Sequence, residues 1–255
     1  MKYLTVAETD VGIVKETNQD SVLVKHADSK LGEIVLAIIC DGMGGLSKGE
    51  LASATVVRRF SEWFEEELPG ELQKLDFEVI SGKWSLMLKD LNTSIGKYGE
   101  THGVRLGTTF TALLIVKDNY LIGHVGDTRV YEIDSSLNQL TEDQTFIARE
   151  LKKGTITPEQ ARVDKRRNML LQCIGASPNV EPEMKTGKCR TGAFLLCSDG
   201  FRHEISEKEI FDMINPKKLS DKEDMHKKLR ALIEMDKKRK EKDNISAVLI
   251  KAFEY

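Results

Sequence analysis

The sequence predicts an α+β fold in which antiparallel sheet packs against pairs of helices. Short apolar segments rich in β-branched residues recur along the chain, bounded by Gly, Asp or Asn, as buried strands are. Helical patterns come two at a time between groups of strands. This arrangement lacks the strict strand–helix alternation of a doubly wound parallel sheet. The sequence shows no internal repeat and no linker rich in Pro, Gly or Ser, so we expect residues 1–255 to form a single domain.

The individual elements follow from apolar spacing and from the residues that bound each segment. The predicted strands are residues 3–7, 21–25, 34–40, 109–116, 120–125, 130–133, 194–197 and 245–253. The predicted helices are residues 49–68, 77–97, 206–214 and 221–240. Apolar residues at 80, 84, 88, 91 and 95 make the second helix clearly amphipathic. We expect Pro69 to end the first helix, and Ser206 with Glu209 to form a capping box.

Composition and charge exclude several classes of protein. The 255 residues include 38 Lys and Arg against 41 Asp and Glu, which gives a formal net charge of −3. A general nucleic-acid binder usually has a basic excess, so this near balance argues against one. The longest apolar run, residues 34–40, is far shorter than the ~20 residues that cross a bilayer. Because the N-terminus also lacks a signal-peptide pattern, we expect a cytoplasmic protein without a membrane partner.

Two features have an ordinary structural explanation and a functional alternative. The cysteines, at positions 40, 173, 189 and 197, form no Cys-x-x-Cys pair, which favours reduced core thiols over disulfides or zinc ligands. Residues 217–242 include 11 basic and 6 acidic residues. We interpret this segment as a solvated helix face that ends in cations, with a patch for an anionic surface or nucleic acid as the alternative.

The most informative feature is a set of aspartates at the ends of predicted strands. They are Asp20, Asp41, Asp127, Asp199 and Asp243. A carboxylate at the end of a buried strand is costly unless something compensates its charge. Oxygen ligands without His or Cys select Mg²⁺ or Mn²⁺ over zinc, and Gly42 would let its carbonyl approach such an ion closely. Any single Asp-Gly is more often a turn, but the whole set predicts a carboxylate metal site.

Six short motifs follow one another along the chain. They are residues 12–20 (GIVKETNQD), 41–45 (DGMGG), 107–109 (GTT), 126–129 (GDTR), 198–200 (SDG) and 243–246 (DNIS). In this order and over the whole chain, they resemble the metal-dependent serine/threonine protein phosphatases (the PPM, or type 2C, family). The resemblance is to the compact bacterial form of that family.

The resemblance implies a fold and a set of ligands. The fold would be a four-layer α/β/β/α sandwich, a central antiparallel β-sandwich flanked by helical pairs, in one phosphatase catalytic domain spanning residues 1–255. The cofactors would be Mn²⁺ or Mg²⁺, with two ions bound tightly and a third more weakly. The implied ligands are Asp20, a bridging Asp41, the Gly42 carbonyl, Asp199 and Asp243 for two ions, and Asp127 with Asp199 for the third.

The resemblance also implies an activity. The protein would hydrolyse phosphoserine and phosphothreonine by direct attack of a water or hydroxide that bridges the two ions. Its partners would be phosphorylated proteins, including a Ser/Thr kinase that it opposes, with no nucleic acid, and the chain would be a monomer. A silent family member that binds phosphoproteins, and another two-metal hydrolase such as a nuclease, are the alternatives. The complete set of aspartates argues against the first, and the charge balance and motif order argue against the second.

Some positions depart from the family pattern. Lys15 stands where the family usually has an arginine that grips the phosphate; we expect Lys15 to contact phosphate as a point charge, without the fork of an arginine. Residues 144–165 correspond to the variable flap beside the active site. There Gln144 and Asp164, and beyond it Gln172, replace commoner residues, which we expect to affect substrate recognition more than metal binding. We expect His124 to be a packed core residue.

Overall fold

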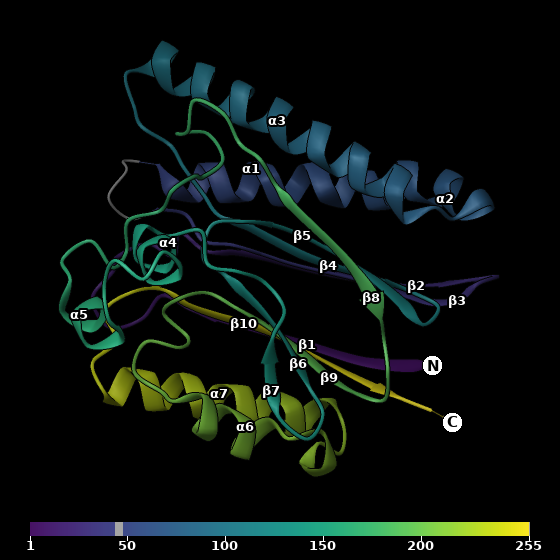
Figure 1. The fold of residues 1–255 in the computed structure, drawn as a ribbon. Coiled ribbons are helices and arrows are strands. Elements are labelled where there is room, and N and C mark those ends of the chain that lie inside the picture. Colours follow the sequence, from purple (N-terminus) through teal and green to yellow (C-terminus); the bar gives the residue numbers. More distant parts are fainter. Residues whose placement is uncertain (44–47, 255) are drawn as a thin grey trace.

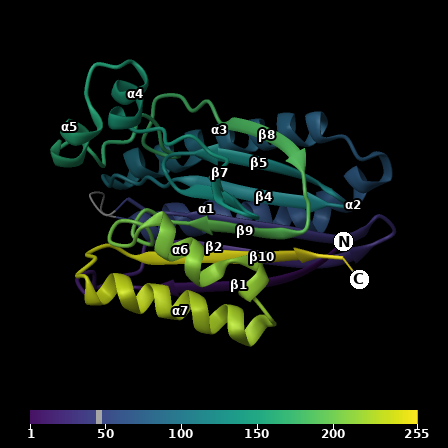
Figure 2. The same cartoon turned by 60° about the horizontal axis from the view of Figure 1, so that its bottom comes forward.

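The computed structural model describes residues 1–43 and 48–254, which form four layers (Figures 1 and 2). The strands of one sheet are, in spatial order, β1 (Lys2–Asp10), β10 (Ile245–Phe253), β9 (Gly192–Cys197), β6 (Arg129–Ile133) and β7 (Leu137–Gln139). Those of the other are β2 (Ser21–Ser29), β3 (Gly32–Cys40), β4 (Phe110–Val116), β5 (Asn119–Val125) and β8 (Glu183–Lys188). The described pairings are antiparallel, and the expected α/β/β/α sandwich is confirmed. Gly44 and Gly45 of the second motif lie outside the described residues.

Every predicted strand is present, but β7 and β8 were not predicted. Their sequences, LNQ and EMKTGK, carry little apolar alternation. Each lies at an edge of its sheet, where one side of the strand has no neighbour to bury it. Edge strands of this kind are formed by backbone pairing and leave a weak sequence pattern.

A pair of helices covers the outer face of each sheet (Figure 1). Helices α1 (Gly49–Glu62) and α3 (Phe77–His102) lie against the β2–β8 sheet. Helices α6 (Glu207–Ile214) and α7 (Lys222–Lys238) lie against the other, and the predicted capping box of α6 is present. Helices α4 (Phe146–Lys152) and α5 (Pro158–Val163), which were not predicted, lie at the end of the sandwich away from both chain termini (Figure 2).

The prediction that Pro69 ends the first helix is wrong. Helix α1 continues into a π-helical turn at Trp63–Glu67, then into α2 (Leu68–Glu71) and a short 3₁₀ turn at Leu72–Lys74. Pro69 lies in the first turn of α2, where its missing N–H removes no hydrogen bond within that helix. The π turn is wider than an α-helical turn, and the helical path continues through it towards Pro69. Trp63, at the start of this turn, is buried.

Alternation along β3 separates two hydrophobic layers. Leu36 and Ile38 pack into the cluster beneath α1 and α3. Val35 and Ile39 pack into the cluster between the two sheets. Both faces of this strand are therefore buried, which explains the continuous apolar run at residues 34–40. A third cluster joins the other sheet to α6 and α7.

The fold shows the state of the cysteines and the character of the helices. Among the described residues the cysteines are free and buried, as expected of core thiols. In the part of the chain that the structure describes, no helix combines the length and the apolar character needed to cross a membrane.

One buried carboxylate on α7 lacks a partner. Asp236 is fully buried, and neither of its carboxylate oxygens has a hydrogen-bond partner among the described residues. Burial, and to a lesser degree the charge of Glu241, raises the pKa of Asp236 from 3.8 to about 8. The folded protein thus keeps a proton that the unfolded chain releases above about pH 4. The contribution of Asp236 to stability therefore falls as the pH rises from about 4 to about 8.

The variant Asp236→Asn should be more stable than the unaltered protein at pH 8, by about 1–3 kcal/mol, because the amide carries no charge to bury. Chemical denaturation across pH 5–8 measures this difference, which should shrink toward pH 5. Asp90→Asn, an exposed aspartate on α3, is the matched control and should show no such trend. A stability difference for Asp236→Asn that does not change with pH would contradict the assignment.

Candidate metal centre

The strand register brings Asp20 and Asp41 to one end of the second sheet. Ser21 pairs with Cys40 across the β2–β3 ladder, so the aspartates that flank this pair leave the sheet together. The backbone N–H of Asp41 donates to the Thr109 hydroxyl at 2.9 Å, which fixes the chain as it leaves β3. Two carboxylates are therefore neighbours although 21 positions separate them in the sequence.

The first sheet brings Asp199 and Asp243 to the same rim. Antiparallel β9 ends two residues before Asp199, and β10 begins two residues after Asp243. The two sheets are joined here because the Asn244 side-chain oxygen accepts a hydrogen bond from the backbone N–H of Gln19 at 2.9 Å. All four aspartates thus lie where both sheets end.

Buried oxygens without partners mark the centre of this rim. Asp20 is 9% exposed and Asp199 is 8% exposed. Within the described residues, neither carboxylate oxygen of Asp20 has a hydrogen-bond partner, and Oδ1 of Asp199 has none. The hydroxyls of Ser246 and Ser198 lie near enough to favour the Asp20 charge somewhat, without forming hydrogen bonds of normal geometry. Such burial is costly, so the described polypeptide does not by itself satisfy these oxygens.

Burial and repulsion by neighbouring carboxylates raise the pKa values of Asp20 and Asp41. The pKa of Asp20 is raised to about 7, first by burial and further by the charges of Asp199 and Asp243. Burial also raises the pKa of Asp41 well above its ordinary value, followed by the charges of Asp20 and Asp199. The charges of neighbouring carboxylates thus act on both Asp20 and Asp41, as expected of a close cluster of like charges.

The chemistry of this cluster fits a hard divalent cation. Carboxylate oxygens are the ligands that Mg²⁺ and Mn²⁺ prefer. The Cys40 thiol lies near Asp20 and Asp41, but burial and these two charges raise its pKa well above the ordinary value. Cys40 therefore keeps its proton and is not offered as a soft metal ligand.

The carboxylates are not arranged around one point as the ligands of a bound ion would be. Among the residues described, no group of three or more His, Cys, Asp and Glu side chains is arranged so that it could hold a metal ion as it stands. Like charges repel, and two of the carboxylates face other cations. Asp243 lies 3.0 Å from Lys15 Nζ, and Asp199 lies 3.4 Å from His203 Nε2.

Asp127, in the turn between β5 and β6, lies next to the cluster. It is 7% exposed. Its pKa is raised to about 7 by burial and then by the charge of Asp199, whereas the Arg202 guanidinium opposes this rise. Arg202 also donates to the backbone oxygen of Asp127 at 3.0 Å. The structure therefore brings together Asp127 and Asp199, the pair that the resemblance assigns to a third ion.

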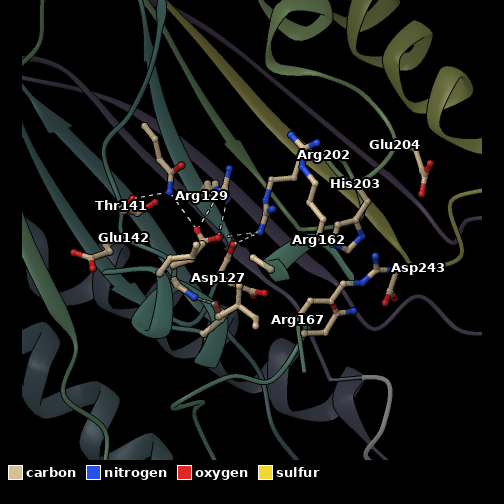
Figure 3. Close-up of a pocket in the computed structure, with 18 of the residues that line it drawn as sticks. Asp127, Arg129, Thr141, Glu142, Arg162, Arg167, Arg202, His203, Glu204 and Asp243 are labelled. Atoms are coloured by element: carbon tan, nitrogen blue, oxygen red, sulfur yellow. Dashed lines mark hydrogen bonds and ion pairs between the residues drawn. The ribbon is translucent and has the colours of Figure 1, made fainter. Parts of the chain in front are cut away.

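Lys15, Asp127 and Asp243 line one pocket of about 1050 Å³ (Figure 3). The rest of its wall comes mainly from α4, α5 and the following loop, and from residues near 139–143, 202–204 and 240–242. Asp20 and Asp199 are not part of its described lining. The predicted phosphate-binding lysine and two predicted ligands thus face the same cavity as the flap.

Gly42 is held by close chain packing. Its N–H donates to the Gln19 carbonyl at 3.1 Å. A Cβ at this position would lie 2.5 Å from the backbone oxygens of both Gln19 and Gly49, so only glycine fits. These contacts explain the residue type, and the metal-binding role of the Gly42 carbonyl stays a prediction.

Sequence reasoning missed a supporting pair, His203 and Glu241. The Nδ1 atom of His203 lies 3.4 Å from the Glu241 carboxylate, on the side opposite Asp199. Glu241 is 5% exposed and also accepts hydrogen bonds from the N–H groups of Lys242 and Asp243, at 2.7 and 2.8 Å. This pair connects the turns that carry Asp199 and Asp243. The spacing of four between Asp199 and His203 was the available signal.

The unusual glutamines support the flap from outside the pocket. Gln144 Oε1 accepts from the Gly126 N–H and from Gln172 Nε2, both at 2.8 Å. Gln172 also bonds the backbone of Glu181, and neither glutamine is part of the described pocket lining. These replacements therefore hold the base of the flap beside Asp127, and their expected effect on substrate recognition stays a prediction.

His124 is a core residue, as predicted. It is fully buried, and burial lowers its pKa to about 4, so it is neutral at physiological pH. One ring nitrogen lies 2.8 Å from the Thr111 hydroxyl and the other 3.0 Å from the Glu142 carbonyl oxygen. Both nitrogens are thus satisfied within the protein, and His124 has no free position for a ligand.

Comparison with known proteins identifies the family. Residues 13–250 match the family model described as Protein phosphatase 2C. The chain is 31% identical over 252 residues to the serine/threonine protein phosphatase PstP of Mycobacterium tuberculosis, covering 98% of this chain and 45% of PstP. It therefore spans about half the length of that relative. It is 32% identical over 225 residues to the serine/threonine phosphatase Stp of Listeria welshimeri, covering 85% of each chain.

Solved structures agree with this assignment. The serine/threonine phosphatase of S. agalactiae is similar with a TM-score of 0.85 and 27% identity, over 99% of this chain and all of the other. The catalytic domain of PstP in complex with two manganese ions is similar with a TM-score of 0.79 and 27% identity, over 99% of both chains. The match of fold, motif order and sequence is continuous along the chain, which belongs to the protein phosphatase 2C family.

Proposed function

We propose that residues 1–255 form one catalytic domain of a protein phosphatase that hydrolyses phosphoserine and phosphothreonine with the aid of Mn²⁺ or Mg²⁺. The observation that carries this proposal is the cluster of aspartates at the rim of both sheets, where Asp20 and Asp199 have buried carboxylate oxygens without hydrogen-bond partners among the described residues. Positive charge at the centre of the cluster would compensate these carboxylates. Membership of the family, and its named phosphatase relatives, support the same conclusion.

We assign the roles residue by residue. Two ions would be held by Asp20, Asp41, the Gly42 carbonyl, Asp199 and Asp243, and a third, weaker ion by Asp127 with Asp199. The two manganese ions of the similar PstP catalytic domain support the count of two. When bound, two divalent ions lower the pKa of a shared water, which makes it a nucleophile for direct attack on phosphorus, and offset charge on the phosphoryl group. The aspartates themselves supply geometry and charge.

Lys15 would contact the substrate phosphate. It lines the pocket and already pairs with a carboxylate, Asp243, at 3.0 Å. A lysine ammonium is a point charge and imposes less orientation on a phosphate than an arginine fork does. Two half-buried arginines nearby, Arg129 and Arg202, are engaged with Asp143 and so support the turn at Asp127.

The partners and setting are part of the same proposal. The substrates would be phosphorylated proteins, and a Ser/Thr kinase would supply the phosphate that this domain removes. We expect the domain to act as a monomer in the cytoplasm, where the free, buried cysteines would stay reduced.

The variant Asp199→Asn tests the metal centre. We expect it to weaken Mn²⁺ binding, measured by calorimetry, and to lower p-nitrophenyl phosphate hydrolysis by at least ~100-fold. Without metal, the same variant should have a higher melting temperature than the unaltered protein, because one buried repulsive charge is gone. The unaltered protein should gain stability from Mn²⁺ and lose its activity in EDTA.

Asp212→Asn, an exposed aspartate on α6, is the control and should leave Mn²⁺ affinity unchanged. Activity that survives both EDTA and Asp199→Asn would overturn the metal-dependent mechanism. Tight Mn²⁺ binding without hydrolysis of any phosphorylated substrate would instead indicate a silent phosphoprotein-binding member of the family.

The variants Lys15→Ala and Lys15→Arg test the phosphate contact. Removing one charge-assisted hydrogen bond should raise KM for a phosphothreonine peptide by about tenfold, and the arginine should restore it. Steady-state kinetics with saturating Mn²⁺ measures both. An unchanged KM in Lys15→Ala would show that Lys15 is a solvated surface lysine.

A further inference from the structure

Four cationic side chains on the pocket wall are in no ion pair or side-chain hydrogen bond with the described residues. They are Arg162, Arg167, Lys240 and Lys242. The other pocket cations are neutralised: Lys15 by Asp243 at 3.0 Å, Lys152 by Glu142 at 2.8 Å, and Arg129 and Arg202 by Asp143 at 2.7 and 3.5 Å. Among the acidic side chains of this described wall, all but Glu204 face a cation or belong to the proposed metal site. The wall therefore has an uncompensated positive charge.

These cations come from two parts of the chain. Arg162 lies on α5 and Arg167 in the loop that follows it, whereas Lys240 and Lys242 follow α7. Figure 3 shows Arg162 and Arg167 around the same pocket as Asp127 and Asp243. All four cations are exposed, so they can meet a ligand that enters from solvent.

The turn that carries the two lysines is fixed in place. Glu241 is buried between them, and its carboxylate accepts from the N–H of Lys242 at 2.7 Å. The N–H of Glu241 in turn donates to the Asp236 carbonyl at 3.0 Å. Lys240 has a left-handed backbone, with φ of 68°, which the surrounding contacts hold. A cation held on a rigid turn loses less freedom on binding than one on a mobile tail.

The phosphate to be removed does not need these charges. In the proposed function it meets Lys15 and the metal ions, deep in the pocket. The four cations line the same cavity, and their side chains have no ion pair or hydrogen bond with the described residues. A ligand that satisfied them would carry anionic groups in addition to the reacting phosphate.

We propose that Arg162, Arg167, Lys240 and Lys242 select phosphoproteins in which further anionic groups flank the phosphorylated residue. These groups are carboxylates of Asp and Glu or a second phosphate. The inference rests on the proposed phosphatase function and specifies its substrate class. It also gives the end of the basic segment at residues 217–242 a role in substrate recognition.

Three phosphothreonine peptides test the proposal, with flanking residues that are Ala, Asp or phosphoserine. The unaltered protein with Mn²⁺ should cleave the Asp-flanked or the phosphoserine-flanked peptide with a kcat/KM about tenfold above that of the Ala-flanked peptide. Comparing these two peptides identifies the source of the charge. The preference should shrink as salt rises from roughly 0.05 to 0.5 M, because exposed charges are screened.

The double variant Lys240→Glu/Lys242→Glu should lose or reverse this preference. Lys227→Glu/Lys238→Glu is the matched control, because it makes the same change in net charge on exposed α7 residues outside the described pocket lining, and it should keep the preference. The preference is a ratio within each protein, so any loss common to all substrates cancels. Equal kcat/KM for all three peptides, or equal loss in both double variants, would overturn this inference alone. No Mn²⁺-dependent hydrolysis of any peptide or of p-nitrophenyl phosphate would overturn the proposed function and this inference with it.

Discussion

Carboxylates of like charge are held in a buried rim because both sheets end at the same place. Asp20 is fixed by the β2–β3 register and Asp199 by the β9–β10 pairing. None of them can move far without breaking strand pairing. Burial is the main cause of the raised pKa values of Asp20, Asp41 and Asp127, and the repulsion between these fixed carboxylates adds to it. A divalent cation would relieve this repulsion. Metal affinity would therefore depend on the same strand pairing that makes the sandwich rigid.

The hydrophobic layers make this rigidity possible. The central cluster takes side chains from both sheets, so that neither sheet can slide on the other without opening a cavity. The outer clusters fasten α1 and α3 to one sheet and α6 and α7 to the other. Polar contacts around the rim add to this rigidity. The Asn244 side chain joins the two sheets by a hydrogen bond, and Glu241 fixes the turn before Asp243 by another. Proteins commonly accept such local destabilisation at a functional site when the rest of the fold is stable.

The sequence predicts those features that one segment determines alone. The apolar run at residues 34–40, the buried face of α3 and the aspartates beside strands are of this kind, and all lie where expected. Edge strands β7 and β8 have no such pattern, and the π turn before Pro69 depends on packing of Trp63. The His203–Glu241 pair and the Gln144–Gln172 bond join residues far apart in the chain, so a single sequence does not show these pairings; the spacing of four between Asp199 and His203 is a signal for His203 alone. Family resemblance supplied ligand roles that spacing alone left open.

The Lys15–Asp243 pair connects metal binding to phosphate binding. Oδ1 of Asp243 lies 3.0 Å from Lys15 Nζ. If this carboxylate also bound a metal ion, its negative charge would be shared between the ion and the Lys15 ammonium. Occupation of the proposed metal site would weaken this ion pair and leave the Lys15 ammonium available to an anion in the same pocket. Two divalent ions would also change the formal net charge of the protein from −3 to +1, which likewise favours the binding of an anion. The near balance of acidic and basic residues thus conceals an unequal distribution. Several acidic side chains meet at the rim, where ions would offset them. Cations that have no ion pair with the described residues line the pocket wall, where a flanking anionic group could meet them.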